Sequence, residues 1–467
     1  MSATSIPAER DEFEKWCKDH EIRTVIAGSA DTNGTWIAKH VSLSELMSLV
    51  DSPSRPGIGF SDVFLVCLRH GWDVVEPTPG LGTYFPNKES GFPDVFFRPD
   101  LSTARMLSWR DRTIGVNGSF VFPDGSEVPV APRSVLAAQI EKAAGRNLEP
   151  RFATEFEFYL LNGSTDTLFP QNYPLEADWP RPNVYQAFRT CVDGERLARW
   201  EEHFGNAGIE MEAIHPENGP GQYELVIRYR EAMRAADDAF IFKNGLKQLA
   251  KIDEKMATFI AVPRSDWPGS SCHVHQSLWS ADNGEPLFHA ADEPHHLSAT
   301  ARHYLGGMLA TMKEFTALYR PTINAYKRAR AYSWAGTTVS WGVDNRSTGV
   351  RLIGEDPGSC RFEHRVGGAD VNPYLVMAAC LAGGLYGIEN EIEPPEAFGG
   401  DAYADDSLEV LPASLEEAIN LFHDSRIARQ CFGDDFVNHY TLMKRGELSE
   451  FASAVTDWEV STYIETA

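Results

Sequence analysis

Arg151-Phe-Ala-Thr-Glu155-Phe-Glu157-Phe-Tyr-Leu160 is the stretch around which the rest of the chain can be arranged. It alternates with a period of two, which is typical of a β-strand. Three phenylalanines fall on one face, and Glu155 and Glu157 fall on the other. Two carboxylates on one strand face repel each other and are costly to desolvate. They form either a solvated surface or the ligands of a cation that removes the repulsion.

Three other segments present ligand-type side chains in the same way. They are residues 271–279 with His273, His275 and Ser277, residues 361–366 with Arg361, Glu363 and Arg365, and residues 215–225 with Glu217 and Glu224. His215 precedes a proline and is expected to be a turn residue. Four strand-like segments with charged side chains on one face predict a single sheet with a polar, cation-filled concavity.

Composition limits the function classes. The chain has 467 residues, 43% of them hydrophobic, and a formal net charge of −25. The lack of a basic surplus argues against nucleic-acid binding. Its seven cysteines are scattered, with no CxxC pair, so we expect reduced thiols in a cytoplasmic protein. The first residues are polar and acidic, so we expect no signal peptide, and no apolar run is long enough to span a membrane.

The pattern predicts an α+β chain of two domains. Residues 1–125 are expected to form a small β-rich domain with two helices, and residues 126–467 a larger domain in which strands and helices interleave. Within the first domain, Val63 to Leu68 is an apolar run expected to be a strand. Within the second, Ser298 to Tyr319 is expected to be one helix.

Carboxylates dominate the candidate metal ligands, which are Glu155, Glu157, Glu217, Glu224, His273 and Glu363. Five carboxylates and one imidazole suit Mg²⁺ or Mn²⁺. Two ions with three protein ligands each would leave open positions for phosphate oxygens, as phosphoryl transfer requires. Five arginines in the same part of the chain could clamp carboxylates and phosphates, or merely balance nearby acids: Arg328, Arg346, Arg351, Arg361 and Arg365.

These residues resemble the type I glutamine synthetase family over nearly the whole chain. The matching motifs, in family order, are Glu155-Phe-Glu157, His215-Pro-Glu217 with Gly219-Pro-Gly-Gln-Tyr-Glu224, His273-Val-His275-Gln-Ser277-Leu, Asn324-Ala-Tyr-Lys-Arg328, Asp344-Asn-Arg346 with Arg351, and Arg361-Phe-Glu363-His-Arg365 with Asn372-Pro-Tyr. The resemblance implies a small N-terminal β-grasp domain and a larger α/β catalytic domain. It also implies a homo-oligomer, usually a dodecamer, with each site between subunits.

The resemblance also implies roles for individual residues. Glu157, Glu217 and Glu224 would hold one metal ion, and Glu155, His273 and Glu363 the other. Glu157, Gly269, Arg328 and Arg365 would bind glutamate, while His275, Ser277, Arg351 and Arg361 would bind ATP. Arg346 would stabilise the transferring phosphoryl group, so that ATP and glutamate form a γ-glutamyl phosphate that an amine attacks.

The chain departs from glutamine synthetases where ammonium should bind. Trp334, in Arg330-Ala-Tyr-Ser-Trp334-Ala-Gly336, stands where the family has a glutamate. The aspartate loop of the N-terminal domain is not recognisable, and Gly57-Ile-Gly-Phe-Ser-Asp62 occupies roughly its place. Removing a carboxylate and adding an indole favours an amine with a carbon body over ammonium. Trp334, Ser333 and Asp62 are therefore the predicted amine pocket.

We therefore expect an ATP-dependent ligase that joins glutamate to an organic amine, such as a polyamine or ethanolamine. A protonated alkylamine, with a pKa of roughly 10, must lose a proton before it attacks. Asp62 and Glu363 are candidate acceptors, besides the leaving phosphate. The alternatives are glutamine synthetase itself, a non-catalytic structural or regulatory relative, and a metal-dependent hydrolase.

Overall fold

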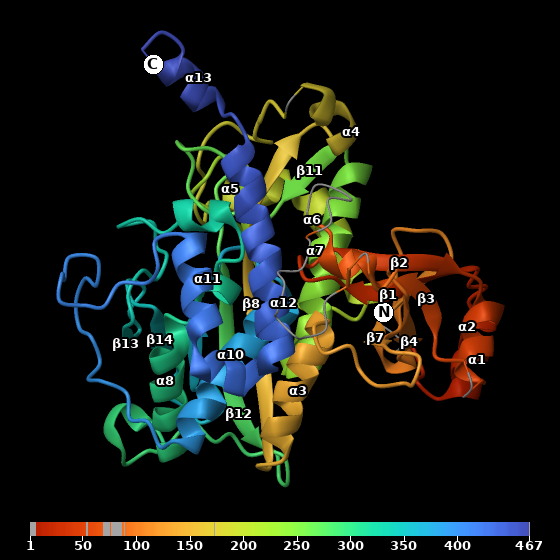
Figure 1. Cartoon of the computed structure of the whole chain (residues 1–467), viewed down its shortest axis with the longest axis horizontal. Helices are drawn as coiled ribbons and strands as arrows, with labels where there is room; N and C mark the ends of the chain where they lie inside the picture. The colour runs from red at the N-terminus through yellow and green to blue at the C-terminus, as the bar shows by residue number, and fades with distance from the viewer. Residues whose placement is uncertain are drawn as a thin grey trace.

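The computed structural model describes residues 6–52, 55–68, 75, 86–87, 89–171 and 173–466. The helices are α1 Arg10–Asp19, α2 Leu43–Val50, α3 Pro132–Ala144, α4 Thr165–Leu168, α5 Ala187–Val192, α6 Gly194–Asn206, α7 Ala232–Ile252, α8 Ala299–Met312, α9 Thr316–Tyr319, α10 Pro373–Glu389, α11 Leu415–Asp424, α12 Arg426–Ser453 and α13 Asp457–Tyr463. Two small parts of the chain, at its two ends, stand out from the main body in Figure 1: the red and orange N-terminal part and helix α13.

The N-terminal part contains two small sheets. Its strands are β1 Thr24–Ala30, β2 Trp36–Val41, β3 Ile58–Ser61, β4 Asp94–Pro99, β5 Arg105–Met106, β6 Thr113–Val116 and β7 Gly118–Val121. One sheet has the order β2-β1-β6-β5, with β1 antiparallel to β2 and parallel to β6, and the other has the order β3-β4-β7. Phe13 of α1 and Leu46 of α2 are buried in the same core as Val25 and Phe97.

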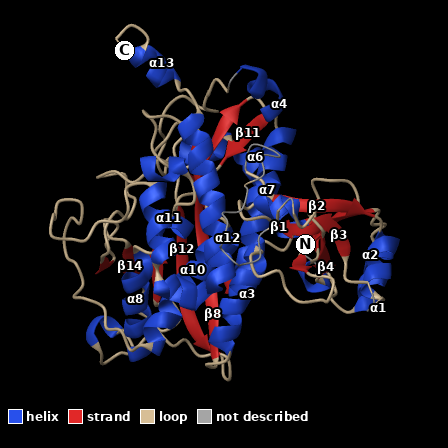
Figure 2. Ribbon diagram, in the orientation of Figure 1, coloured by secondary structure: helices blue, strands red, loops and turns tan. Residues whose placement is uncertain are grey.

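The larger part is built on one eight-stranded sheet. Its strands are β8 Leu148–Asn162, β9 Met211–Pro216, β10 Gln222–Glu231, β11 Lys255–Thr258, β12 Cys272–Ser280, β13 Trp341–Val343, β14 Val350–Ile353 and β15 Arg361–His364. The order is β13-β14-β15-β12-β8-β10-β9, and β11 pairs with β8. All pairs are antiparallel except β13 with β14. Figure 2 shows helices gathered over this sheet.

The phenylalanines of β8 face the helices. Phe156 packs on Phe242 of α7 with ring centroids 5.9 Å apart, and both rings are buried. Phe158 packs on Phe242 as well, at 6.4 Å. Burial of this aromatic face leaves the opposite face of β8, with its glutamates, for chemistry. The alternation of the strand therefore separates core from site, as the sequence predicts.

Buried polar contacts join the two parts of the chain. The side chain of Asn372, which caps α10, donates to the carbonyl of Asp31 at 3.0 Å. Asn117 donates to Asp237 of α7 at 2.7 Å, and Arg105 forms an ion pair with Asp238 at 2.5 Å. The Asn372-Pro-Tyr motif thus belongs to this junction. The boundary at residues 125 and 126 stays a prediction.

Two element predictions are wrong. Val63 to Leu68 is not a strand: residues Asp62–Val66 form a 3₁₀ helix, η1. A continuous apolar run does not distinguish a strand from a helical turn, and here Val66 packs on Leu442 and Met443 near the other end of the chain. The helix expected from Ser298 to Tyr319 is broken into α8 and α9.

The seven cysteines, all among the described residues, carry free thiols. None of the helices that the structure describes is both long and apolar enough to cross a membrane.

Candidate metal and active site

Strand register brings the predicted ligands onto one face of the large sheet. In antiparallel pairs, residues directly opposite each other lie on the same face. The facing pairs are Glu157 with Glu224, Glu155 with His273, His275 with Glu363, and Glu363 with Arg351. These pairs run from β10 through β8, β12 and β15 to β14. The expectation of one sheet with a polar face is confirmed.

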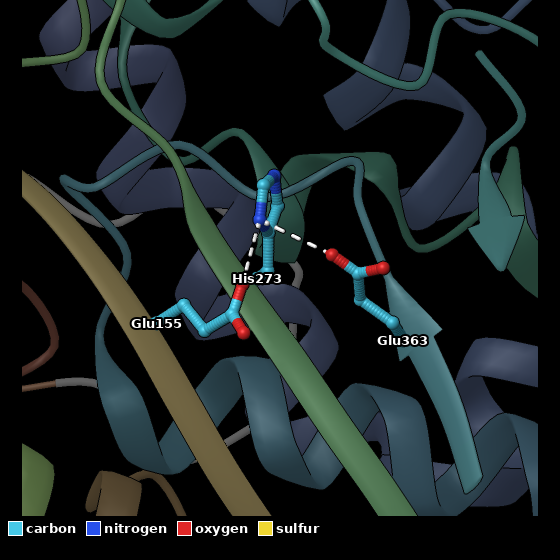
Figure 3. Close-up of side chains that lie close together, drawn as sticks. All are labelled: Glu155, His273 and Glu363. Atoms are coloured by element: carbon cyan, nitrogen blue, oxygen red, sulfur yellow. Dashed lines mark hydrogen bonds and ion pairs between the residues drawn. The ribbon is translucent and has the colours of Figure 1, made fainter. Parts of the chain in front are cut away.

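The first cluster consists of Glu155, His273 and Glu363, from β8, β12 and β15 (Figure 3). One ligand atom of each lies within 4.8 Å of the others. His273 Nδ1 is 3.3 Å from Glu155 Oε2 and 3.3 Å from Glu363 Oε1. The other ring nitrogen, Nε2, is buried without a hydrogen-bond partner among the described residues. Two carboxylates and an imidazole that converge in this way fit a hard divalent cation.

Positive groups surround the first cluster. Burial would raise the pKa of Glu363, but Arg365, together with the two histidines, lowers it to about 2. Arg365 Nη1 lies 2.5 Å from Glu363 Oε1, and Arg351 Nη1 lies 3.1 Å from Oε2. Burial would also raise the pKa of Glu155, but His275 and His273 hold it well below its usual value. Both carboxylates are therefore ionised without a metal ion.

The second cluster consists of His215, Glu217 and Glu224, whose ligand atoms also lie within 4.8 Å of one another. His215 Nε2 is 3.0 Å from Glu224 Oε1. Burial, followed by the charges of Glu157 and Glu224, raises the pKa of Glu217 to about 7. These carboxylates repel one another, so a divalent cation fits here by charge as well as by donor type.

Glu157 is close to the second cluster but is held separately. Its carboxylate accepts hydrogen bonds from the backbone N–H of Ser271 at 2.8 Å and from the Ser271 hydroxyl at 2.6 Å. His215 occupies the third place in the ligand group instead. The expectation that His215 is a turn residue is wrong: it lies in β9, opposite Glu224. The proline that follows suggested a turn, whereas strand pairing with β10 holds the histidine in the sheet.

Arg328 and Gly269, two of the residues predicted to bind the substrate glutamate, lie next to each other. The Arg328 guanidinium is buried, and its Nη1 donates to the carbonyl of Val366 at 3.3 Å. Its Nη2 has no hydrogen-bond partner among the residues that the structure describes. A Cβ on Gly269 would lie 2.7 Å from Cγ of Arg328, so the glycine lets the backbone approach the arginine. Burial lowers the pKa of Arg328.

Arg365 links the first cluster to the predicted amine pocket. One nitrogen of its guanidinium meets Glu363, and Nη2 donates to the carbonyl of Trp334 at 3.2 Å. Its Nε is buried without a partner among the described residues. Two buried arginines with unused N–H groups are rare unless a ligand or solvent satisfies them. They suit an anionic substrate.

The predicted ATP ligands fall partly into one pocket. A cavity of about 240 Å³ is lined by Glu155, His275, Ser277 and Arg361, among others. Arg361 Nε donates to His275 Nδ1 at 3.1 Å. Arg351 lies outside this lining and contacts Glu363 and Asp344. Arg346 is exposed in the turn between β13 and β14.

The three predicted amine-pocket residues come from two places. Trp334 and Ser333 lie in the loop before β13, where Trp334 is exposed and the Ser333 hydroxyl donates to the carbonyl of Arg330 at 2.6 Å. Asp62 is buried in η1 of the N-terminal part. Its place in an amine pocket stays a prediction.

Sequence reasoning missed Tyr185. Its ring packs on His215 with centroids 4.6 Å apart, and burial, with Glu217 and Glu224, raises the pKa of its hydroxyl. The residue has a left-handed backbone, φ 55°, in a loop rich in proline. Such a loop has no periodicity, so the sequence offers no signal for its contact with the second cluster.

Residues 129–463 match the family model described as glutamine synthetase, catalytic domain. A glutamate–isopropylamine ligase from Pseudomonas is 38% identical over 462 residues, which cover 98% of this chain and 97% of the relative. A gamma-glutamylethanolamide synthetase, GlnA4, from Streptomyces coelicolor is 38% identical over 378 residues, 81% of this chain and 80% of the relative. A type-1 glutamine synthetase from Dictyostelium discoideum is 35% identical over 445 residues, 94% of this chain and 83% of the relative.

A solved structure described as a GmaS/ADP complex has the same fold. Its TM-score is 0.82 at 26% identity, and the match covers 97% of this chain and 99% of that one. The α+β fold class expected from the sequence is confirmed, with its small N-terminal sheet domain and its large catalytic domain. The chain belongs to the glutamine synthetase family.

Proposed function

We propose that this protein is an ATP-dependent ligase that joins the γ-carboxyl group of glutamate to an organic amine through a γ-glutamyl phosphate. One observation carries the proposal: Arg328 and Arg365, with unused buried N–H groups, lie beside a sheet face with two acidic clusters. Relatives named as glutamate–isopropylamine ligase and gamma-glutamylethanolamide synthetase support the amine-ligase activity.

Two divalent cations, Mg²⁺ or Mn²⁺, are the proposed cofactors. Glu155, His273 and Glu363 would hold one, and Glu217 and Glu224 the other, with Glu157 or His215 as the third ligand. Bound there, the ions would neutralise charge on the phosphates of ATP and on the transferring group. Before they bind, the arginines already keep the carboxylate of Glu363 ionised and oriented.

Glutamate is proposed to bind through Arg328 and Arg365, with the backbone of Gly269 and the carboxylate of Glu157 beside it. Guanidinium groups grip carboxylates bidentately, and burial strengthens the attraction. Because Arg365 also contacts Glu363 and the carbonyl of Trp334, it would set the bound glutamate between the first cluster and the amine.

ATP is proposed to bind in the pocket lined by His275, Ser277 and Arg361, with Arg351 at the phosphates. The exposed Arg346 is free to approach the transferring phosphoryl group from the turn after β13. Positive charge at this position would be worth most in the transition state, where charge spreads over the equatorial oxygens.

The amine is proposed to enter beside Trp334 and Ser333. An indole can stack on an alkylammonium ion and exclude water from its carbon body. Glu363 is a weak base, because its pKa of about 2 reflects close pairing with Arg365. The amine proton is proposed to pass to Asp62 or to the leaving phosphate instead. We also propose that the protein works in the cytoplasm as a homo-oligomer, a dodecamer by family likeness.

The first test measures phosphate release from ATP with glutamate and Mg²⁺ against a panel of amines: ammonium, ethanolamine, putrescine, spermidine, isopropylamine and aniline. We expect turnover with an organic amine and little with ammonium. Turnover with ammonium alone would make this protein a glutamine synthetase. No turnover with any amine, from protein that still binds ATP and metal, would support the non-catalytic alternative.

A matched pair of variants tests the metal assignment. Glu155→Gln should abolish phosphate release, because it removes a ligand of the first cluster. Glu149→Gln, on the same strand but paired with Arg151, should retain it. Activity that survived Glu155→Gln would contradict the assignment.

A further inference from the structure

The loop from residue 330 to residue 336 is held in an unusual conformation. Tyr332 and Trp334 both have left-handed backbones, with φ of 62° and 60°. Residues with side chains adopt this region rarely, because the backbone is strained there. Such strain persists only where surrounding contacts impose it, and it often marks a functional segment.

Two buried arginines hold the backbone of this loop by hydrogen bonds to its carbonyl groups. The carbonyl of Trp334 accepts a hydrogen bond from Arg365 at 3.2 Å, and the carbonyl of Gly336 accepts one from Arg320 at 2.6 Å. Arg320 and Arg365 are both buried. The loop is thus fixed to the guanidinium group that also contacts Glu363.

Tyr403, from the segment between α10 and α11, supports the same loop. Its hydroxyl donates to the carbonyl of Ala335 at 2.9 Å, and its ring packs on Tyr332 with centroids 5.4 Å apart. Tyr403 is half-buried, whereas Tyr332 is 65% exposed and Trp334 56% exposed. Exposed aromatics are ordinary when single. Two exposed aromatic residues whose strained backbones are held by buried groups are unusual.

The charges around Tyr403 are mostly positive. Burial raises the pKa of its hydroxyl, the charges of Arg365, Arg328 and Arg320 oppose that rise, and Asp401 adds to it. Tyr403 therefore lies in the field of the two arginines proposed to bind glutamate. The guanidinium of Arg365, whose Nη2 lies 3.2 Å from the carbonyl of Trp334, places a positive charge beside this loop that disfavours a second ammonium group on the amine.

We propose that Tyr332 and Trp334, held by Tyr403, form an aromatic wall that selects primary monoamines with a small hydrocarbon body and rejects both ammonium and diamines. This inference rests on the proposed ligase function and deepens it. Methyl groups of the amine that pack on the rings remove apolar surface from water, a stabilisation that ammonium cannot gain. Tyr332 and Trp334 would touch the amine, and Tyr403 is a positioning residue that acts through the Tyr332 ring and the Ala335 carbonyl.

The test compares kcat/KM for ammonium, methylamine, ethylamine, isopropylamine and putrescine in the wild type and its variants. Tyr332→Ala should lower kcat/KM for isopropylamine by about 10-fold or more, mainly through KM for the amine, because several methyl contacts are lost. KM for ATP should not change. Tyr173→Ala removes a tyrosine that packs on exposed Phe169 at 5.9 Å, and it should leave the amine profile unchanged.

Tyr403 is tested with a graded pair. Tyr403→Phe keeps the ring that packs on Tyr332 and loses the hydrogen bond to Ala335, so it should retain most of the preference for isopropylamine. Tyr403→Ala should lose the preference while glutamate still binds with its wild-type KM. Circular dichroism and chromatography of each variant verify that it folds.

The outcomes separate the two proposals. The wild type could use alkylamines while the Tyr332 and Tyr403 variants lose activity equally with ammonium and every amine. This result would contradict the aromatic wall and leave the proposed ligase function supported. A wild type that prefers putrescine to ethylamine would also overturn the wall. If the wild type turns over no amine, the ligase function fails, and the wall fails with it.

Discussion

The two acidic clusters lie on one sheet face and differ in their counter-charges. Glu363 of the first cluster contacts Arg351 and Arg365, and Glu155 lies against His275 and His273. Within the described residues, the second cluster contains one imidazole, that of His215, and the pKa of Glu217 is raised to about 7. The two sets of ligands are similar, but their charges are balanced differently before any metal ion binds. Positive groups contact the carboxylates of the first cluster, whereas the carboxylates at the second cluster repel one another.

The difference predicts that the two clusters affect the stability of the metal-free protein in opposite directions. The first cluster is balanced, so its carboxylates are ionised and oriented in advance, and a cation gains little from relieving repulsion there. At the second cluster, Glu217 is repelled by the carboxylates of Glu157 and Glu224, and a bound cation would remove this repulsion. We therefore expect the first cluster to contribute to the stability of the metal-free protein and the second to weaken it.

The largest expected effect comes from breaking the balanced cluster. Glu363→Gln leaves the buried Arg365 without its charge partner and leaves Arg351 paired only with Asp344, so the metal-free protein should lose about 3–5 kcal/mol of stability. Thermal unfolding in EDTA measures this loss. Phosphate release should also fall by at least about 10³-fold, since a metal ligand is lost. A melting temperature equal to that of the wild type would show that the arginines do not depend on Glu363.

A smaller effect comes from adding metal to the repulsive cluster. Mn²⁺ at 100 times its dissociation constant should stabilise the folded protein by about 2.7 kcal/mol for each site filled. Thermal shifts with and without Mn²⁺ measure this gain. In Glu217→Gln, the stabilisation by Mn²⁺ should be smaller by the contribution of one site. A binding titration should then find one tightly bound Mn²⁺ ion fewer than in the wild type. If both variants, Glu217→Gln and Glu149→Gln, bound the full complement of metal, the second cluster would not be a metal site.

The smallest effect is the pH dependence of the metal-free protein. The pKa of Glu217 is about 7 in the folded state and about 4.3 in an unfolded chain, so the folded state holds the extra proton between these values. The contribution of this group to stability is therefore present below about pH 4 and is lost as pH rises to about 7. In EDTA, the melting-temperature difference between Glu217→Gln and the wild type should widen from pH 5 to pH 8. A difference that is constant across this range would contradict the raised pKa.

Much of the site follows from local sequence patterns. Alternation along residues 151–160 predicts both the core face of β8 and its acidic face, and the spacing of His273 and His275 predicts that both lie on one strand face. The structure confirms these faces. Local pattern fails where the partner is distant: the run predicted as a strand contains most of the 3₁₀ helix Asp62–Val66, which packs on α12, and His215 joins a strand.

The amino-acid sequence by itself determined the ligand chemistry: carboxylates and histidines on strand faces, arginines nearby, and a tryptophan in place of a carboxylate. Only the tertiary structure decided which of these groups balance one another. Strand order places β15, which Arg365 follows, between β12 and β14 with its Arg351, and places β9 with a single histidine beside β10. The free energy of a buried charge depends on its neighbours in space, and those neighbours come from segments that are far apart in the chain.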